Sequence, residues 1–507
     1  MKYARLEIVP AFLFLAVLSA AATNYVNQFG WTLFYGDAES HLNIARRVVD
    51  SRTPGYDQLG TVWLPLLHVL TLPLAGNDRW WRSGLAGAVP SSACFVLAGI
   101  FLFAAMRRAA KSSAVAWAAL GLFALNPNLL YLQSTPMMEP VFLAGFMALL
   151  YFTILFRDTQ SFWVVLGAAL ASLAASLSRY DGWFVIPFVT LYFVLAARRR
   201  KFVTAAIFAA IAALGPLYWL GHNWWLYNNP LEFYNGPYSP KAIYQRALAQ
   251  KMDPYPGDRD WRKAWLFFRT AAWLCTGWGA MLAGAMGLGS VIRKRLFWPV
   301  FLVSLPPMFY LWSMHAGQIP IFVPQLWFNS YYNTRYALSV LPLLAIAGGC
   351  IPLLAGNRLR PLIAVAVIVV GAMPWLIHRK PDDWICWKES QVNSESRRAW
   401  TRDAARFMHN QYRPGEGIFT SLGDLAGILR EAGIPFREAL QEGNEPAWMA
   451  ATTRPDLFLH EEWAIAISGD PVATAVQRAT FKNGPRYHLV HASMLKGAPV
   501  IEIYKRD

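Results

Sequence analysis

The stretch Gly36-Asp37-Ala38-Glu39-Ser40-His41 combines two carboxylates with an imidazole. Apolar residues at three- and four-residue spacing follow it and predict a helix, namely Leu42, Ala45 and Val49. On that helix Asp37 takes the capping position, His41 lies one turn further on, and Glu39 is close by. A carboxylate and an imidazole would then project into the same space, where they could act as a base. Asp is also a favoured cap, so the local pattern leaves a purely structural role open.

Glu139 stands at the start of a second apolar segment, 138–156. Unpaired carboxylates at or inside a membrane boundary are costly and tend to mark functional sites. An acidic side chain at a helix N-terminus is, however, also favourable by about 0.3–1 kcal/mol. The sequence therefore supports a functional and a structural interpretation of Glu139 equally.

Two arginines belong to short polar motifs, Ser178-Arg179-Tyr180-Asp181-Gly182 and Asn333-Thr334-Arg335-Tyr336. A guanidinium is the usual group for binding phosphate in a partly dry site, because its planar fork donates two parallel hydrogen bonds. Arg179 could instead pair with Asp181, and both side chains could extend to lipid headgroups. We keep both arginines as candidate phosphate ligands, with Arg335 ahead of Arg179.

The segment 222–263 is dense in Trp, Tyr and Asn. Flat rings with polar edges suit the faces of sugars, but they also form the aromatic belt of a membrane interface. We expect the belt to explain most of them. The candidate substrate-binding residues are Trp225 and Tyr234 here, and Tyr332 and Asn333 beside Arg335.

The composition shows which elements must hold these residues. Of 507 residues, 56% are hydrophobic and 15% are charged, whereas soluble chains carry about 25% charged residues. Apolar stretches near the length of a bilayer-spanning helix recur about eleven times. They are roughly 8–27, 84–106, 114–133, 138–156, 161–178, 182–197, 203–221, 264–291, 296–313, 336–355 and 361–378. We therefore expect a polytopic α-helical membrane protein.

Short basic turns set the orientation of these spans. If the N-terminus with Lys2 and Arg5 is cytoplasmic, alternation places every basic turn on the cytoplasmic side, as the positive-inside rule requires. The net charge of +16 then reflects topology, and nucleic acid is excluded as a partner. A cleavable signal peptide over 1–23 is the alternative for the first segment, and it would leave the sidedness of the loops unchanged.

The same alternation places the polar segments outside, including the first loop, 28–83, and the tail from 379. The tail has ordinary charge and turn residues, and it predicts a small α/β domain. Strands are expected at 417–422, 456–460 and 499–504, and helices at 425–431 and 471–479. The predicted domains are thus 1–378, in the membrane, and 379–507, extracytoplasmic. Four scattered cysteines suggest neither zinc nor a disulfide framework.

The order and sidedness of these motifs resemble the GT-C membrane glycosyltransferases, which take a sugar from a polyprenyl-phosphate carrier on the outer membrane face. The likeness rests on the motif at 36–41, Glu139, the Arg179 and Arg335 motifs and the extracytoplasmic tail. The chain looks nearer to bacterial protein mannosyltransferase and aminoarabinose transferase types than to oligosaccharyltransferases, because it has no WWDYG motif in the tail. The resemblance implies a hexosyl- or pentosyltransferase in the inner membrane of a bacterium.

By this resemblance Asp37 is the catalytic carboxylate of an inverting displacement, and Arg335 and Arg179 bind the donor phosphate. Some members of the superfamily hold a divalent metal. Asp37, Glu139, Glu39 and His41 are then candidate ligands, and their hard oxygens would suit Mg²⁺ or Mn²⁺. The implied partners are a polyprenyl-phosphate-sugar donor, membrane lipids, and an acceptor that is a protein, a lipid or a glycan.

Three alternatives stay open at this point. The first is transfer of a whole oligosaccharide from a polyprenyl-diphosphate carrier. The second is a lipid or solute transporter, although transporters usually show inverted repeats and polar residues at the bilayer midplane. The third is a membrane scaffold, which would not explain why carboxylates and arginines gather on one face.

We expect Asp37→Asn to abolish sugar transfer while the protein still folds and inserts, because the substitution removes a charge with little change of shape. Sugar release from polyprenyl-phosphate donors by the purified wild type and variant measures the effect. Normal transfer by the variant would contradict the assignment of Asp37.

Overall fold

The computed structural model describes residues 2–482 and 484–507, and it forms two compact units. The helical unit comprises Met1–Phe29, Thr61–Leu67 and Ala88–Glu389. The α/β unit comprises Gly30–Gly60, His68–Gly87 and Ser390–Asp507. This division differs from the predicted domains, 1–378 and 379–507. Most of the first loop, 28–83, belongs with the tail, and the tail's unit begins at 390 rather than 379.

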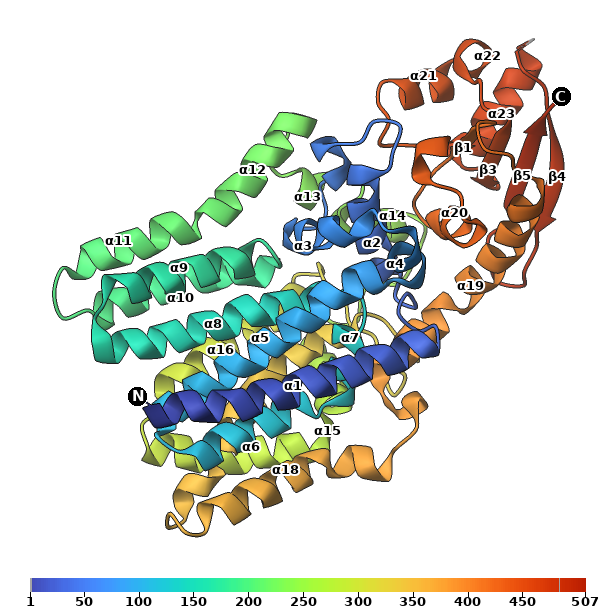
Figure 1. Ribbon diagram of the computed structural model, residues 1–507. Helices are drawn as coiled ribbons and strands as arrows, with labels where there is room; N and C mark the ends of the chain where they lie inside the picture. Colours follow the sequence, from blue (N-terminus) through green and yellow to red (C-terminus); the bar gives the residue numbers. More distant parts are fainter. Residues whose placement is uncertain (1, 483) are drawn as a thin grey trace. The chain divides into compact units, whose positions relative to one another are not determined.

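The helical unit is built almost entirely of helices (Figure 1). Its longer elements are α1 (Lys2–Gln28), α5 (Leu85–Ala110), α6 (Ser113–Ala124), α7 (Pro127–Gln133), α8 (Met138–Thr159), α9 (Phe162–Ser176), α10 (Tyr180–Ala196), α11 (Lys201–Ala212), α12 (Leu214–Tyr227), α14 (Pro240–Ala249), α15 (Trp261–Arg293), α16 (Phe297–His315), α17 (Leu341–Gly349) and α18 (Arg360–Ile377). Shorter elements include α13 (Glu232–Asn235), η2 (Thr334–Val340), η3 (Ile351–Leu354) and η4 (Pro381–Asp383).

Eight of the described helices are long and apolar enough to cross a membrane, so the chain is a multi-pass membrane protein. This is fewer than the roughly eleven spans predicted, although all the predicted segments are helical. Helices α9 and α10 hold only 15 and 17 residues, and α6 and α7 are a pair bent by 69°. The bend occurs where the Asn126 side chain caps α7 and Pro127 occupies its first turn.

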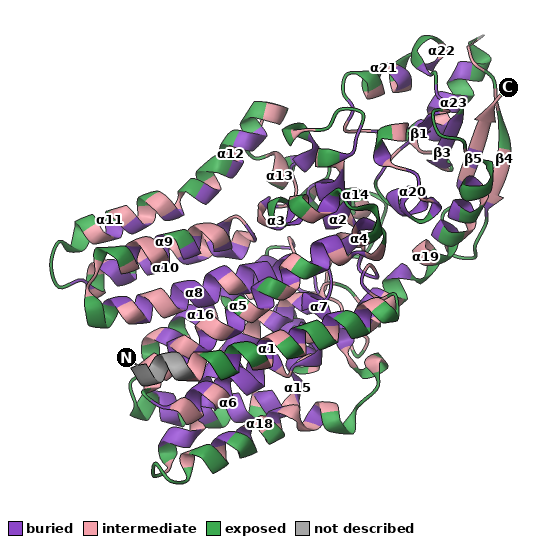
Figure 2. Cartoon of the chain, in the orientation of Figure 1, coloured by how far each residue is buried: buried purple, intermediate pink, exposed green. Residues whose placement is uncertain are grey.

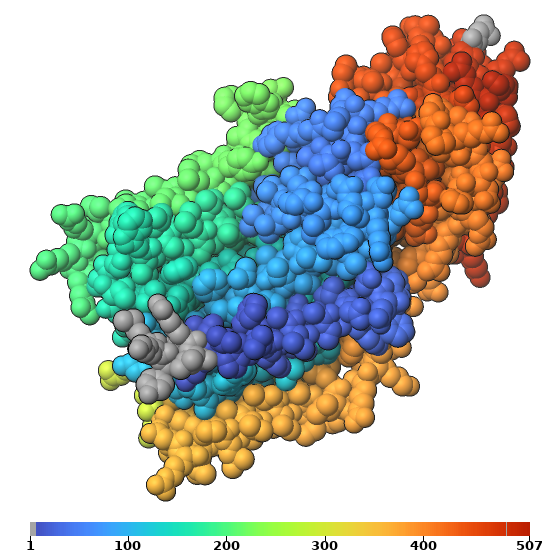
Figure 3. Space-filling view, in the orientation of Figure 1, coloured from blue at the N-terminus to red at the C-terminus, as the bar shows by residue number. Residues whose placement is uncertain are grey.

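Burial separates the central helices of this unit from the peripheral ones (Figure 2). In α8 and in 334–354, 83% and 78% of the apolar window is buried. In α1, in 201–227 and in α18 the share is only 22%, 28% and 22%, and large apolar side chains face outward. In space-filling view α1, in dark blue, lies on the surface (Figure 3). Peripheral helices with exposed apolar side chains are what a lipid environment requires.

The basic turns at one end of the helical unit meet as the alternation predicted. Arg107 Nε lies 2.7 Å from Glu7 Oε2, and Arg108 Nη2 lies 2.8 Å from Asp158 Oδ2. The backbone N–H of Arg198 donates to Gln160 Oε1 at 2.9 Å. These contacts bring the turns after α5, α8 and α10 together. The side chains of Lys2 and Arg5 lie outside the described part, and the side of the membrane that this end faces stays a prediction.

The α/β unit holds a five-stranded sheet in the order β2-β1-β3-β5-β4. The strands are β1 (Ile418–Thr420), β2 (Ala439–Leu440), β3 (Trp463–Ile467), β4 (Tyr487–Ser493) and β5 (Ile501–Arg506). β1 pairs in parallel with β2 and β3, and β5 pairs antiparallel with β3 and β4. The helices and turns are α2 (Gly36–Val49), η1 (Tyr56–Leu59), α3 (Leu66–Ala75, whose first two residues lie in the helical unit), α4 (Asp78–Ser83), most of α19 (Ile385–Gln411), α20 (Ala426–Ala432), η5 (Phe436–Glu438), α21 (Ala447–Thr453), α22 (Pro455–Phe458) and α23 (Pro471–Phe481).

The predicted fold class, a helical membrane protein with a small α/β domain, is confirmed, but two local predictions are wrong. The stretch 456–460 begins in the short helix α22, because Pro455 opens a helical turn and Leu457 and Phe458 are half-exposed. The neighbouring central strand is β3. Asp37 lies inside the first turn of α2, and the capping position belongs to Tyr35, which makes no side-chain capping bond.

Close packing of α15 against α17 depends on small residues. A Cβ placed on Gly287 would lie 1.8 Å from the carbonyl oxygen of Ala347, whereas one on Gly289, two residues along the same helix, would meet nothing within 4 Å. Gly287 thus allows the two backbones to approach at a distance that any larger residue prevents.

We expect Gly287→Ala to lower the free energy of unfolding by about 1–3 kcal/mol, because α17 must move away from α15. The matched control, Gly289→Ala, should leave stability unchanged or raise it by up to about 1 kcal/mol through helix propensity. Thermal unfolding of both variants in the same detergent measures the difference. Equal melting temperatures would contradict the packing role of Gly287.

Candidate functional site

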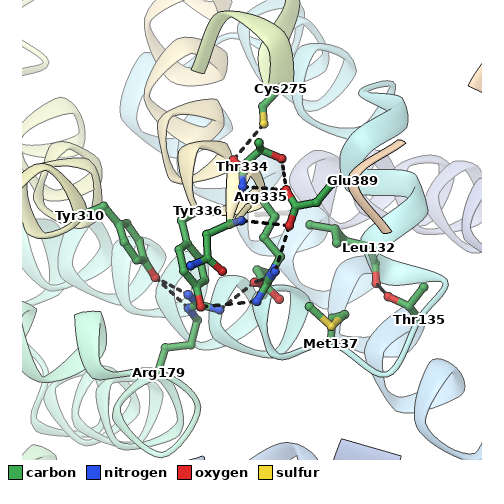
Figure 4. A network of polar contacts seen from close by, with 12 residues as sticks. Leu132, Thr135, Met137, Arg179, Cys275, Tyr310, Thr334, Arg335, Tyr336 and Glu389 are labelled. Atoms are coloured by element: carbon green, nitrogen blue, oxygen red, sulfur yellow. Dashed lines mark hydrogen bonds and ion pairs between the residues drawn. The ribbon is translucent and has the colours of Figure 1, made fainter. Parts of the chain in front are cut away.

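Five charged side chains meet at one end of the helical unit, and we call them the arginine–carboxylate cluster: Glu139, Arg179, Asp181, Arg335 and Glu389. Figure 4 shows Arg179, Arg335 and Glu389 of this cluster with their neighbours. Each comes from the beginning of a helix. Glu139 is in the first turn of α8, Arg179 precedes α10, Asp181 is in its first turn, Arg335 is in η2, and Glu389 is in α19. Their side chains are 13% exposed or less.

Glu139 is the shared partner of the two arginines. Its Oε1 lies 2.9 Å from Arg179 Nη1 and 3.2 Å from Arg335 Nε. Its Oε2 is buried with no hydrogen-bond partner among the described residues. A favourable place at a helix N-terminus does not account for contacts with two guanidiniums, so the structure favours a role in the cluster.

Two stacked tyrosines support the guanidinium groups. The rings of Tyr310 and Tyr336 lie 5.1 Å apart and nearly parallel. Arg179 donates from Nε to the Tyr310 hydroxyl at 3.0 Å, and its guanidinium lies 5.0 Å from the Tyr336 ring. Arg335 lies 4.8 Å from that same ring. The Tyr310 hydroxyl in turn donates to Asp181 Oδ2 at 3.2 Å. Ring faces and hydroxyls therefore hold both arginines in fixed orientations.

Glu389 completes the cluster, and the sequence did not indicate it. Its carboxylate accepts hydrogen bonds from the backbone N–H groups of Asn333 and Thr334, at 3.0 and 2.8 Å, and lies 3.4 Å from Arg335 Nη1. Asn333 has φ +56°, a left-handed conformation that aims both N–H groups at one acceptor. Burial raises the pKa of Glu389, an effect that Arg335 and these hydrogen bonds oppose. Glu389 therefore positions Arg335.

A small cavity of about 30 Å³ adjoins the cluster. Arg179, Arg335 and Glu139 line one part of it. The rest is mostly apolar, and Leu129, Leu132, Phe142, Leu143, Phe146, Pro306 and Leu338 line it. This volume has room for only a few water molecules. The site thus places two buried guanidiniums, each paired with carboxylates, beside an apolar wall.

The α2 motif lies in the α/β unit. Asp37 is half-buried in the first turn of α2, where the helix dipole favours its negative charge. Glu39 pairs with Arg430 and Arg397, at 3.2 and 3.5 Å. His41 Nδ1 lies 3.1 Å from His68 Nε2. Burial, with help from the nearby His41 and Arg47, lowers the pKa of His68 well below its usual range. The His68 ring is therefore neutral at ordinary pH.

These contacts bear on the predicted metal ligands. Glu39 and His41 have protein partners, and Glu139 Oε1 lies against two guanidiniums. Among residues 2–482 and 484–507, no group of three or more His, Cys, Asp and Glu side chains could hold a metal ion. This donor set does not fit Mg²⁺ or Mn²⁺ in the arrangement described, and the metal stays a prediction.

The candidate substrate-binding residues have different positions. Asn333 belongs to the loop held by Glu389, and its side chain donates to the carbonyl of Pro320 at 3.1 Å. Tyr332 pairs with Phe322 in an antiparallel bridge. Trp225, on α12, is 82% exposed, as expected of an interface belt. Tyr234, on α13, lies beneath Lys241 Nζ, which is 4.9 Å from its ring. None of the four lines the cavity.

Comparisons with known proteins give a likeness at the level of the fold. No family model matches the chain, and no curated protein matches it. Among solved structures, it is similar to the crystal structure of ArnT from Cupriavidus metallidurans bound to undecaprenyl phosphate. The identity is 12%, the TM-score is 0.48, and the match covers 96% of this chain and 97% of that one. Such an identity assigns no residue correspondences, and the proposals below depend on this chain's own side chains.

We expect Glu389→Ala to lower the free energy of unfolding by about 3–5 kcal/mol, because Arg335 and two backbone N–H groups would lose a buried partner. Glu395→Ala, an exposed position on the same helix, is the matched control and should have little effect. Thermal unfolding in detergent compares the two variants. Equal melting temperatures of Glu389→Ala and Glu395→Ala would show that Glu389 does not stabilise the arginine–carboxylate cluster.

Proposed function

We propose that this chain is an integral-membrane glycosyltransferase of the GT-C type. It would move a sugar, hexose or pentose, from a polyprenyl-phosphate donor to an acceptor on the extracytoplasmic face of a bacterial inner membrane. The observation that supports the proposal most directly is the cavity of the helical unit, where an apolar wall meets two buried arginines. A phosphate on an isoprenoid chain has the same two parts in the same order.

The charge of the cluster accounts for how such a phosphate would bind. Two guanidiniums face three carboxylates, Glu139, Asp181 and Glu389, so the cluster has no spare positive charge when all three are ionised. An incoming phosphate must therefore replace a carboxylate contact rather than add to the existing ones. Glu139 is the contact to replace, because it touches both arginines and its second oxygen has no partner among the described residues.

In the proposed reaction the acceptor hydroxyl attacks the anomeric carbon and the bond from that carbon to the phosphate oxygen breaks. Asp37 is the proposed carboxylate that takes or orients the hydroxyl proton. The electron pair of the broken bond passes to the lipid phosphate, and the configuration at the anomeric carbon inverts. Arg335, with Arg179, would stabilise the charge that develops on the phosphate, which removes the need for a general acid.

The distribution of charge argues against a transporter. The ion pairs of the helical unit lie at the ends of helices, Arg107–Glu7 and Arg108–Asp158 at one end and the arginine–carboxylate cluster at another set of helix starts. Transporters place their ionisable residues near the middle of the bilayer. No step of the proposed reaction is assigned to a metal ion, and chelation tests the predicted Mg²⁺ or Mn²⁺ independently.

We expect Arg335→Gln to reduce sugar release from polyprenyl-phosphate donors by about 10²–10³-fold, the usual cost of removing one group that stabilises a developing anion. Arg335→Lys should retain part of the activity, because an ammonium keeps the charge without the two-pronged geometry. The control is Arg293→Gln, an exposed arginine at the end of α15, which should behave as wild type.

The assay uses detergent-purified protein, a panel of polyprenyl-phosphate sugars, the presence or absence of EDTA, and mass spectrometry of the products. Equal activity of Arg335→Gln and its control would refute the phosphate role. A polyprenyl-diphosphate oligosaccharide that copurifies with the wild type would favour the oligosaccharide-transfer alternative.

A further inference from the structure

The α/β unit contains a second, larger cavity, which we call the Tyr412 pocket. Its volume is about 410 Å³, within the range of roughly 300–1,000 Å³ typical of small-molecule sites. Its polar lining consists mainly of Asp78, Arg82, His409, Tyr412, Arg437 and Glu438. These residues come from α4, from the end of α19 and the residue that follows it, and from η5. The proposed sugar transfer uses none of them.

Two of these side chains, Asp78 and Arg437, form ion pairs with a buried network. Arg46, 2% exposed, lies 2.7 Å from Asp50 Oδ2 and 2.6 Å from Asp78 Oδ1. Asp50 also pairs with Arg437 Nη1 at 3.1 Å. Yet the side chains of Asp78 and Arg437 are 64% and 63% exposed. Each is anchored through one atom and presents its remaining polar atoms outward.

The other polar groups are fixed in the same way. Glu438 Oε2 accepts hydrogen bonds from the Tyr412 hydroxyl at 2.6 Å and from the backbone N–H of Gly415 at 2.9 Å. His409 Nδ1 lies 3.1 Å from the carbonyl oxygen of Ala432, a contact in which Nδ1 is the donor. Arg82 Nη2 donates to the carbonyl of Gly433 at 3.2 Å. Side chains held by second partners form a preorganised site.

The residues that line the Tyr412 pocket favour one class of ligand. Two guanidiniums are matched by two carboxylates, which disfavours both a polyanion and a polycation. The lining offers both donors and acceptors, and the ring of Tyr412 supplies apolar surface. A pyranose has hydroxyls that both donate and accept, and a face of C–H groups that packs on an aromatic ring. We propose that the Tyr412 pocket binds a neutral saccharide.

Saccharide binding to the Tyr412 pocket can be measured without a donor lipid and without turnover. Its test is therefore independent of the proposed glycosyltransferase activity. The full chain in detergent is tested by saturation-transfer NMR and by titration with glucose, galactose, mannose, N-acetylglucosamine and their trimers. Glucosamine and galacturonate provide the charged comparisons. We expect at least one neutral sugar to bind, and more tightly than either charged one.

Two variants localise the binding. Asp78→Asn and Arg437→Gln each remove one charged hydrogen-bonding group, and each should weaken binding by about tenfold. Their matched controls, Asp424→Asn and Arg478→Gln, change exposed residues of the same unit that do not line the pocket, and should bind as wild type.

Hydrogen exchange of the wild type provides a readout that does not depend on any variant folding. The bound sugar should protect 78–82, 408–414 and 432–438 and leave the rest of the α/β unit unchanged. Absence of binding by every neutral sugar, tighter binding of a charged sugar, or protection confined to other segments would each overturn the proposal.

Discussion

The burial of two guanidinium groups at the end of an apolar bundle is the constraint on which the helical unit depends. Arg179 and Arg335 are 13% and 5% exposed, and an unpaired buried charge costs several kcal/mol. Glu139 meets both arginines, and Glu389 and Asp181 each meet one. Satisfying these contacts requires the beginnings of α8, α10, η2 and α19 to converge. The architecture and the candidate phosphate site are therefore consequences of the same ion pairs.

Small residues make that convergence possible. The loop that carries Arg335 leads through η2 into α17, and α17 packs on α15 at Gly287, where a methyl group would collide with the backbone of Ala347. Cys275, also on α15, donates from Sγ to the carbonyl of Thr334 at 3.2 Å. Packing along α15 and the hydrogen bonds that Asn333 and Thr334 donate to Glu389 thus fix this segment from two directions. The four cysteines, Cys275 among them, are free and buried.

In the α/β unit, too, a buried arginine connects separate segments through ion pairs, and this arginine is Arg46. Arg46 joins Asp50, which directly follows α2, to Asp78 on α4, and Asp50 accepts a hydrogen bond from the backbone N–H of Phe436 at 3.1 Å. Leu42 and Trp81 lie in one core with residues of the tail such as Trp400 and Ile428. A segment that reads as a membrane loop is thereby part of the same core as the tail. The Tyr412 pocket adjoins this network, which holds Asp78 and Arg437 through ion pairs although their side chains are exposed.

The sequence by itself determined the apolar segments and the small α/β domain, and it indicated Glu139, Arg179 and Arg335 as candidate site residues. The apolar segments and the domain follow from local composition and periodicity, and the candidate residues follow from the cost of a charge beside an apolar segment. Each of these signals is contained in a short stretch of sequence. Only the tertiary structure decided which side chains these residues contact. Glu389 is 54 residues from Arg335 along the chain, and nothing in its own segment indicates that it caps a distant loop. Local sequence also did not predict the strand at 463–467, the helical turn at 455–458, or that residues 30–60 belong to the same unit as the tail. Strand pairing and domain membership depend on which surfaces become buried together, and that is a property of contacts between segments far apart in the chain.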